Sequence, residues 1–325
     1  MDLFAIYAAL PRPSQPGSFS AERSDGNVRV ARSFDGHPAI LIAFQSASGE
    51  GVARRLAMLA YHPPASVDVV ATDGHHSAGE VAILECTTSE SELASYFFQV
   101  VTSILLPETQ AGDEARFESA LDAVISLFRA LQKPGVRTTQ GLWAELAVIA
   151  WSRRPLETLT AWHSSPRALH DFAAGSMRLE VKSTSLELRE HTFLLEQLAT
   201  RHGGTTLVAS LILEEERGGT SVMDLVTEIR RRVGGQAEPT RRLEAIVAES
   251  VGIALVELEG HRYDLDAARR SVLLYPAEAI PTIPEPLPTE VRHVQFTVDL
   301  STTTPVSIED GRRRGPFFEA ILPDA

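Results

Sequence analysis

The feature that most constrains the fold is a pair of strand-like runs, residues 168–173 and 177–183, separated by small residues around Gly175. Glycine accepts the backbone angles of tight turns, so two such runs with a short break predict a β-hairpin. If the runs pair across this turn, Asp171 of the first comes close to Glu180 of the second. We therefore expect two acidic side chains from separate strands to converge at one point of a sheet.

The second run of this hairpin also places a lysine beside the second acidic residue. Side chains alternate between the faces of a strand, so Glu180 and Lys182 point to one face, and Leu179 and Val181 point to the other. The chain has 30 lysine and arginine residues, of which only Lys133 and Lys182 are lysines. Lysine can lose its proton in a suitable site, whereas arginine cannot. This difference gives a chemical reason for a lysine at this position.

A third acidic residue lies on a predicted helix over residues 140–151, which either Thr138 or Thr139 can cap. The apolar stripe of this helix begins at Leu142, and Glu145 follows three residues later, at the edge of the same stripe. A carboxylate that faces inward is unfavourable unless it meets a cation or a hydrogen-bond donor. The converging acidic pair offers a site for such a cation.

These residue types predict a divalent-metal site. Two converging carboxylates repel each other unless a cation lies between them, and oxygen ligands suit Mg²⁺, with Mn²⁺ as a substitute. We expect Asp171 and Glu180 to hold the metal, with the carbonyl oxygen of Val181 as a further ligand. Glu145 would bind a second metal or a metal-bound water, and Lys182 would orient or deprotonate the attacking water. The predicted reaction is hydrolysis of a phosphodiester bond.

The order of predicted elements divides the chain into three parts. Short strands separated by turn residues fill residues 27–87 and predict a β-rich N-terminal domain over residues 1–110. Residues 111–235 alternate helices with strand candidates, one of them at 159–162, and this order predicts a mixed β-sheet core flanked by helices. Residues 236–325 are expected to form an α/β extension.

Charge and composition restrict the partners and the compartment. The net charge of −13 opposes DNA binding by the whole surface, because affinity for nucleic acid comes largely from neutralised phosphates. The acidic balance favours help from a partner subunit or a homodimer. The single cysteine, Cys86, indicates a reducing, cytoplasmic setting. No apolar run approaches the roughly 20 residues of a membrane-spanning helix, so no membrane partner is expected.

The chain also resembles a known group of enzymes. The resemblance is carried by Gly-Leu-Trp-Ala-Glu-Leu at 141–146, His-Asp-Phe at 170–172, Leu-Glu-Val-Lys-Ser-Thr at 179–184 and the following run at 191–198. These segments resemble the PD-(D/E)XK nuclease superfamily and, more narrowly, a bacterial family described as "PD-(D/E)XK motif protein". The similarity spans about residues 140–214.

The resemblance implies a restriction-endonuclease-like α/β fold and a Mg²⁺-dependent endonuclease that hydrolyses DNA. Carried over by position, the catalytic set is Glu145, Asp171, Glu180 and Lys182, with His191 and Gln197 as accessory residues. Members of that family tend to be encoded with DNA methyltransferases and helicase-like ATPases in restriction or phage-defence loci, which implies a partner of that kind. The aspartate follows a histidine here, where the superfamily has a proline.

Two alternatives remain open on the sequence. The chain could be a non-catalytic or partner-dependent subunit of a defence complex that retains the nuclease fold. It could instead be a nuclease directed at RNA. Cleavage assays with DNA and RNA, and with substitutions at Asp171 and Lys182, separate these readings.

Overall fold

The computed structural model describes most of the chain, namely residues 2–44, 52–71, 76–88, 90–109, 114–135, 137–162, 168–199, 204–252, 255, 258, 260–284, 287–288 and 290–323. The chain divides into two compact units. Residues 1–136 and 240–256 form unit 1, and residues 137–239 and 257–325 form unit 2. The division into three parts at residues 110 and 235 stays a prediction.

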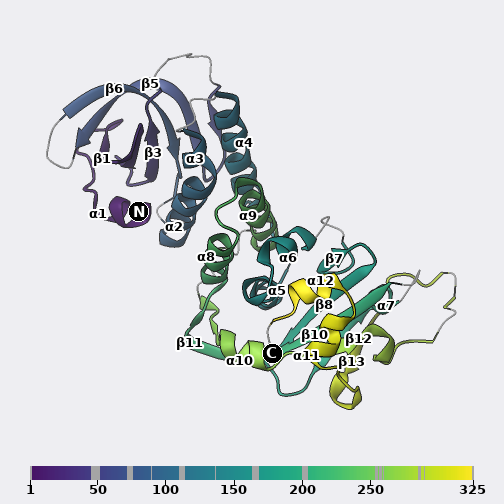
Figure 1. The fold of residues 1–325 in the computed structure, drawn as a ribbon. Helices are drawn as coiled ribbons and strands as arrows, with labels where there is room; N and C mark the ends of the chain where they lie inside the picture. The colour runs from purple at the N-terminus through teal and green to yellow at the C-terminus, as the bar shows by residue number, and fades with distance from the viewer. Residues whose placement is uncertain are drawn as a thin grey trace. The chain divides into compact units, whose positions relative to one another are not determined.

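Unit 1 is built around a sheet that closes on itself. Its strands are β1 (Phe19–Asp25), β2 (Val28–Ser33), β3 (Pro38–Ile42), β4 (Arg54–Arg55), β5 (Ala60–Ala71) and β6 (His76–Glu85). They follow the order β1-β2-β3-β6-β5-β4, and β1 also pairs with β5 in parallel. Figure 1 shows these strands curving around a common interior.

The interior of this sheet is apolar. Leu41 of β3 lies opposite Ile83 of β6, and both belong to a buried cluster that includes Phe19 of β1. Burial of such side chains stabilises the fold by roughly 25 cal/mol for each Å² removed from water. The strands expected within residues 27–87 are confirmed. Strand β1 was not predicted, because its Ser, Glu, Arg and Asp residues carry little strand propensity and it is stabilised by pairing on both sides.

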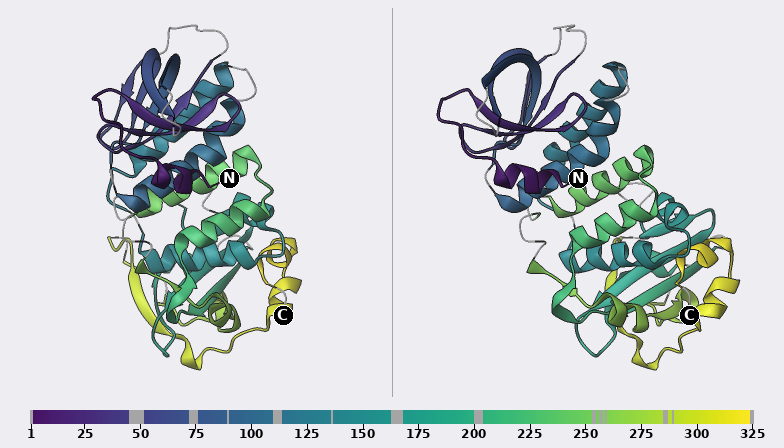
Figure 2. Two further views of the ribbon diagram at one scale, coloured as in Figure 1. Left: turned by 90° about the vertical axis from the view of Figure 1, so that its left-hand side faces the viewer. Right: turned by 60° about the vertical axis from the view of Figure 1, so that its left-hand side comes forward.

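Unit 1 also contains helices, the first of which contacts β2. They are α1 (Leu3–Ala9), α2 (Ser91–Val100), a π-helical turn (Val101–Leu105), α3 (Leu106–Thr109), α4 (Glu114–Ala130) and most of α9 (Ala237–Val251). Figure 2 shows α2 and α4 on the same side of the strands. Asp2 caps α1 by accepting hydrogen bonds from the backbone of the first turn.

Unit 2 contains the mixed sheet. Its strands are β7 (Phe172–Ala174), β8 (Met177–Thr184), β9 (Glu190–Leu194), β10 (Thr205–Ile212), β11 (Glu215–Thr220), β12 (Leu273–Pro276) and β13 (Gln295–Asp299). The main sheet has the order β12-β10-β8-β7, in which β8 and β10 are parallel and the outer pairs are antiparallel. Strands β9 and β13 form a separate antiparallel pair. The predicted mixed α/β character of this region is confirmed.

Helices flank the sheet of unit 2. They are α5 (Thr139–Trp151), α6 (Pro155–Ala161), α7 (Leu195–Leu198), α8 (Val222–Arg232), α10 (Leu265–Arg270), α11 (Ile308–Arg313) and α12 (Pro316–Ile321), with 3-10 turns at Ala277–Ala279 and Leu300–Thr302. Helix α5 packs against both β8 and α8.

The strand predicted at residues 159–162 is wrong. Residues up to Ala161 belong to α6, and Pro155 begins this helix. Proline favours the first position of a helix because its φ angle is already helical and its missing N–H would have no partner there. Trp162, at the end of α6, makes one isolated bridge to Phe172.

None of the helices in the described part of the chain combines the length and the apolar character that a bilayer span requires.

Candidate active site

The predicted hairpin is present and forms the base of the site. Strands β7 and β8 pair antiparallel from Phe172 opposite Leu179 to Ala174 opposite Met177. Gly175 has a φ angle of 58° in the intervening turn, a conformation that glycine adopts without a steric penalty. Continuing the register by one residue brings position 171 opposite position 180, so both side chains fall on one face of the hairpin.

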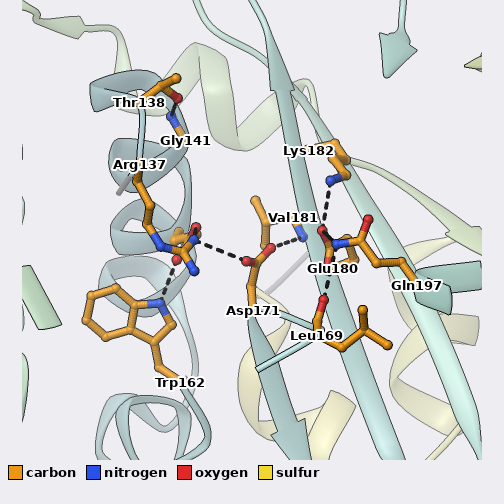
Figure 3. A network of polar contacts seen from close by, with 11 residues as sticks. Arg137, Thr138, Gly141, Trp162, Leu169, Asp171, Glu180, Val181, Lys182 and Gln197 are labelled. Atoms are coloured by element: carbon orange, nitrogen blue, oxygen red, sulfur yellow. Dashed lines mark hydrogen bonds and ion pairs between the residues drawn. The ribbon is translucent and has the colours of Figure 1, made fainter. Parts of the chain in front are cut away.

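Asp171 is held by the backbone of the neighbouring strand. It directly precedes β7, not within the strand as expected, and its Oδ2 accepts a hydrogen bond of 2.8 Å from the Val181 N–H. Its Oδ1 lies 3.4 Å from Nη1 of Arg137, and its side chain is 11% exposed. The carboxyl group is therefore fixed in orientation next to β8 (Figure 3).

Glu180 and Lys182 share one face of β8, as the alternation of side chains predicted. Nζ of Lys182 lies 2.8 Å from Oε1 of Glu180, and the same oxygen accepts a hydrogen bond of 2.6 Å from Nε2 of Gln197. The other oxygen, Oε2, is buried and has no hydrogen-bond partner among the described residues. Burial is the largest effect on Glu180 and, with the nearby Asp171 carboxylate, raises its pKa to about 8, while Lys182 opposes this shift.

Gln197 orients the Glu180 carboxyl group. Besides Glu180, its Nε2 donates to the Leu169 carbonyl oxygen at 3.1 Å, and its Oε1 accepts from the Leu194 N–H at 2.9 Å. Both ends of the amide are thus held by backbone groups. Figure 3 shows the contact with Leu169. His170 reaches the backbone of Gln197, with Nε2 at 3.0 Å from its carbonyl oxygen. The family resemblance in the sequence implies an accessory role for Gln197, and the structure places this residue next to Glu180 in the acidic cluster.

His191, the other expected accessory residue, has a different partner. Its Nε2 lies 2.7 Å from Oγ of Ser210 on β10, and its side chain is buried. Burial lowers the pKa of His191 to about 4, and the positive charges of Lys182 and Arg189 add to this shift. The ring is therefore neutral near pH 7 and links β9 to the main sheet.

Glu145 approaches the cluster from helix α5. Thr138 caps this helix by accepting a hydrogen bond of 3.1 Å from the Gly141 N–H, which selects one of the two predicted caps. Glu145 faces inward as expected, but it does not lie at the edge of a buried stripe, because every residue from Leu142 to Ala150 is buried. The apolar spacing of this segment could not distinguish a helix covered on one side from a helix covered all round.

The buried Glu145 carboxyl group has three neighbours. Trp162 donates a hydrogen bond of 2.7 Å from Nε1 to Oε2, Nη1 of Arg137 contacts Oε1, and the Asp171 carboxyl group lies within hydrogen-bonding reach. Burial raises the pKa of Glu145, and the Arg137 guanidinium and the Trp162 hydrogen bond oppose this shift. The side chain is 4% exposed, so these contacts compensate a carboxylate that water barely reaches.

Arg137 and Trp162 are members of the site that the sequence analysis missed. Arg137 precedes the cap of α5 and was one of many arginines, and Trp162 lay in a segment assigned to a strand. Neither has a local pattern that marks a site residue. The only available signal was the need of an inward-facing Glu145 for a donor or a cation.

The donor set fits a hard divalent cation. Among the residues that the structure describes, no three His, Cys, Asp or Glu side chains are grouped to hold a metal ion by themselves. Within the described part of the chain, Glu180 nevertheless has a buried oxygen without a hydrogen-bond partner, next to the fixed carboxylate of Asp171. The two carboxylates, the Val181 carbonyl oxygen and water make a ligand set of the type that Mg²⁺ accepts. Fully ionised, the three carboxylates and the two cations Arg137 and Lys182 leave one negative charge uncompensated.

Comparison with known proteins identifies the family. No curated protein and no solved structure matches the chain. A family model described as "Putative PD-(D/E)XK family member, (DUF4420)" matches residues 4–301, and this match covers most of both units and every residue of the acidic cluster. The chain belongs to this family, whose description names the PD-(D/E)XK group.

Proposed function

We propose that the protein is a metal-dependent endonuclease that hydrolyses DNA phosphodiester bonds, with a restriction-endonuclease-like arrangement of its core. The observation that carries this proposal is the buried Oε2 of Glu180, which has no hydrogen-bond partner among the residues that the structure describes. It lies beside Asp171, and Lys182 is on the same face of β8. A buried carboxylate oxygen without a partner is costly, and a cation would compensate it. Membership of the PD-(D/E)XK group supports the same reading.

Asp171 and Glu180 would hold Mg²⁺ or Mn²⁺, with the Val181 carbonyl oxygen as a further ligand. Glu145 would bind a second ion or a metal-bound water. When bound, the ion would polarise the phosphate and lower the pKa of a bound water. Lys182 is 20% exposed on its side chain, so its ammonium group can reach both Glu180 and a substrate. Its donors would orient the attacking water or offset the charge that develops on the phosphate.

The substrate and its setting complete the proposal. DNA is the favoured substrate, and restriction or phage defence is the favoured role. The net charge of −13 favours a partner subunit of the methyltransferase or helicase type, or a homodimer, as a source of DNA affinity. One observation favours the alternative of a partner-dependent subunit: Arg137 already contacts two of the carboxylates.

The test is cleavage of supercoiled plasmid DNA in Mg²⁺ or Mn²⁺, with an RNA of matched length in parallel. Asp171→Asn and Lys182→Ala should each lower the rate by at least about a hundredfold, as expected when a group that stabilises the transition state is lost. Lys133→Ala is the matched control, because Lys133 is the only other lysine and is exposed in unit 1.

The outcomes separate the alternatives. Cleavage that survives both site substitutions excludes this active site. Cleavage of RNA alone supports the RNA-directed reading. Absence of cleavage in the wild type, with and without a candidate partner, supports the non-catalytic subunit.

A further inference from the structure

We propose that Arg137 is a built-in counter-ion that competes with the divalent metal for the carboxylates of Asp171 and Glu145, and that metal binding releases it. The inference rests on the proposed function, since it concerns the same carboxylates. It goes further, because it assigns a role to an arginine outside the predicted site set. It also makes the metal affinity depend on the competition between Arg137 and the metal ion.

The contacts of Arg137 carry the first step. A single nitrogen, Nη1, contacts Oε1 of Glu145 and lies 3.4 Å from Oδ1 of Asp171. These carboxylates come from different elements, a helix and the start of a hairpin, and one guanidinium contacts both. Figure 3 shows the contact between Arg137 and Asp171. A positive group between two converging carboxylates provides the charge that a metal ion would otherwise supply.

The distribution of partners over the carboxylate oxygens carries the second step. Asp171 uses Oδ2 for the Val181 N–H and Oδ1 for Arg137. Glu180, by contrast, has Oε2 without a hydrogen-bond partner among the described residues. An ion shared by Asp171 and Glu180 could bind Oε2 of Glu180 directly, whereas Oδ1 of Asp171 already contacts the Arg137 guanidinium. Arg137 therefore has to yield Oδ1 before that ion can be fully coordinated.

The exposure of Arg137 makes such an exchange feasible. Its side chain is 28% exposed, whereas those of Glu145 and Asp171 are 4% and 11% exposed. The carboxylates are confined by the fold, while the long arginine side chain borders on solvent and can turn outward. A divalent ion and a guanidinium also repel each other at short distance, more strongly in a partly buried site than in water. The two cations thus exclude each other on Asp171, and one replaces the other.

The experiment measures Mn²⁺ binding by isothermal titration calorimetry on the full chain, without nucleic acid. Arg137→Gln should bind Mn²⁺ about tenfold more tightly than the wild type, the change expected when one charge-assisted contact no longer has to be broken. In EDTA the same variant should melt at a lower temperature than the wild type, because the buried carboxylates lose a compensating cation. A merely structural role of Arg137 would weaken metal binding and would not tighten it.

Arg178→Gln is the matched control. It removes the same charge from strand β8, where Arg178 donates to the backbone oxygens of Gly175 and Met177. We expect its Mn²⁺ affinity to stay within about twofold of the wild type, because metal binding breaks none of its contacts. If Arg137→Gln does not fold, Arg137→Lys takes its place, since lysine keeps the charge without the planar fork, and a smaller tightening is expected.

The inference is overturned if the Mn²⁺ affinity of the Arg137 variant is unchanged or weaker than that of the wild type. It is also overturned if the Arg178 control binds Mn²⁺ more tightly by the same factor, because this would indicate a long-range charge effect. If the wild type binds Mn²⁺ and Asp171→Asn does not, the proposed metal site is supported whatever the result for the Arg137 variant. A wild type that does not bind Mn²⁺ at all removes the proposed function and this inference together.

Discussion

The main sheet of unit 1 and the main sheet of unit 2 use their buried surface in different ways. In unit 1 the interior of the closed sheet holds apolar side chains such as Leu41 and Ile83. In unit 2 strand β8 buries Glu180 between the apolar residues Leu179 and Val181, and α5 buries Glu145. Apolar burial stabilises a fold directly, whereas a buried carboxylate destabilises it unless a partner compensates its charge. The comparison indicates that unit 2 gives up stability to bury a cluster of charged groups, a cost of the kind that functional sites commonly carry.

The largest expected effect tests the apolar side of this comparison. Leu41→Ala should lower the free energy of unfolding by about 3 kcal/mol, because Leu41 is fully buried and its truncation leaves a cavity. Urea denaturation measures the change. The affinity for Mn²⁺ should not change, since the acidic cluster lies in unit 2. If Leu41→Ala is fully folded but no longer binds Mn²⁺, the assignment of separate roles to the two units is contradicted.

The second prediction concerns the pH dependence of the metal-free protein. The pKa of Glu180 is raised to about 8 in the folded state from 4.5, so the folded state holds a proton that the unfolded state releases. Stability from this group is complete below pH 4.5 and is lost as the pH rises through about 8. Between pH 5.5 and pH 7 in EDTA, the free energy of unfolding should fall by about 2 kcal/mol more in the wild type than in Glu180→Gln.

The control for this measurement is Glu196→Gln, on an exposed glutamate of α7. Its pH profile should follow that of the wild type. An equal slope in the wild type and in Glu180→Gln would mean that Glu180 does not hold a proton in the folded state.

The third prediction tests how the carboxylate is oriented. Gln197→Ala removes the donor to Oε1 of Glu180, and Mn²⁺ affinity should fall about tenfold, the usual effect of losing a residue that orients a metal ligand. Calorimetric titration measures it. Gln140→Ala is the control, because Gln140 contacts Ser183 of the same strand at 3.4 Å and no carboxylate. Equal losses in both variants would indicate a general disturbance of β8.

The smallest expected effect concerns the start of α5. Thr138→Ala should lower the free energy of unfolding by about 1 kcal/mol, because the Gly141 N–H loses its acceptor. Thr138→Ser keeps the hydroxyl group and should restore most of the stability in thermal unfolding. If the serine variant is as unstable as the alanine variant, the cap does not hold the helix that carries Glu145.

Part of this arrangement followed from local patterns. The turn at Gly175, the shared face of Glu180 and Lys182, and the cap of α5 each depend on residues close together in the chain, so spacing alone predicts them. Local patterns were insufficient at residues 159–162, which were assigned to a strand, because a short apolar run fits a strand as well as a buried helix.

The hairpin, the order of the acidic residues along it and the mixed α/β class of the chain can therefore be predicted from local sequence patterns. Three features depend on contacts between distant residues: β1 closes the sheet of unit 1, Glu145 is buried on all sides, and Arg137, Trp162 and Gln197 are partners of the carboxylates. The physical reason is that backbone periodicity depends on neighbours in the chain. The partner of a buried charge is chosen by whichever distant side chain packing brings within hydrogen-bonding distance.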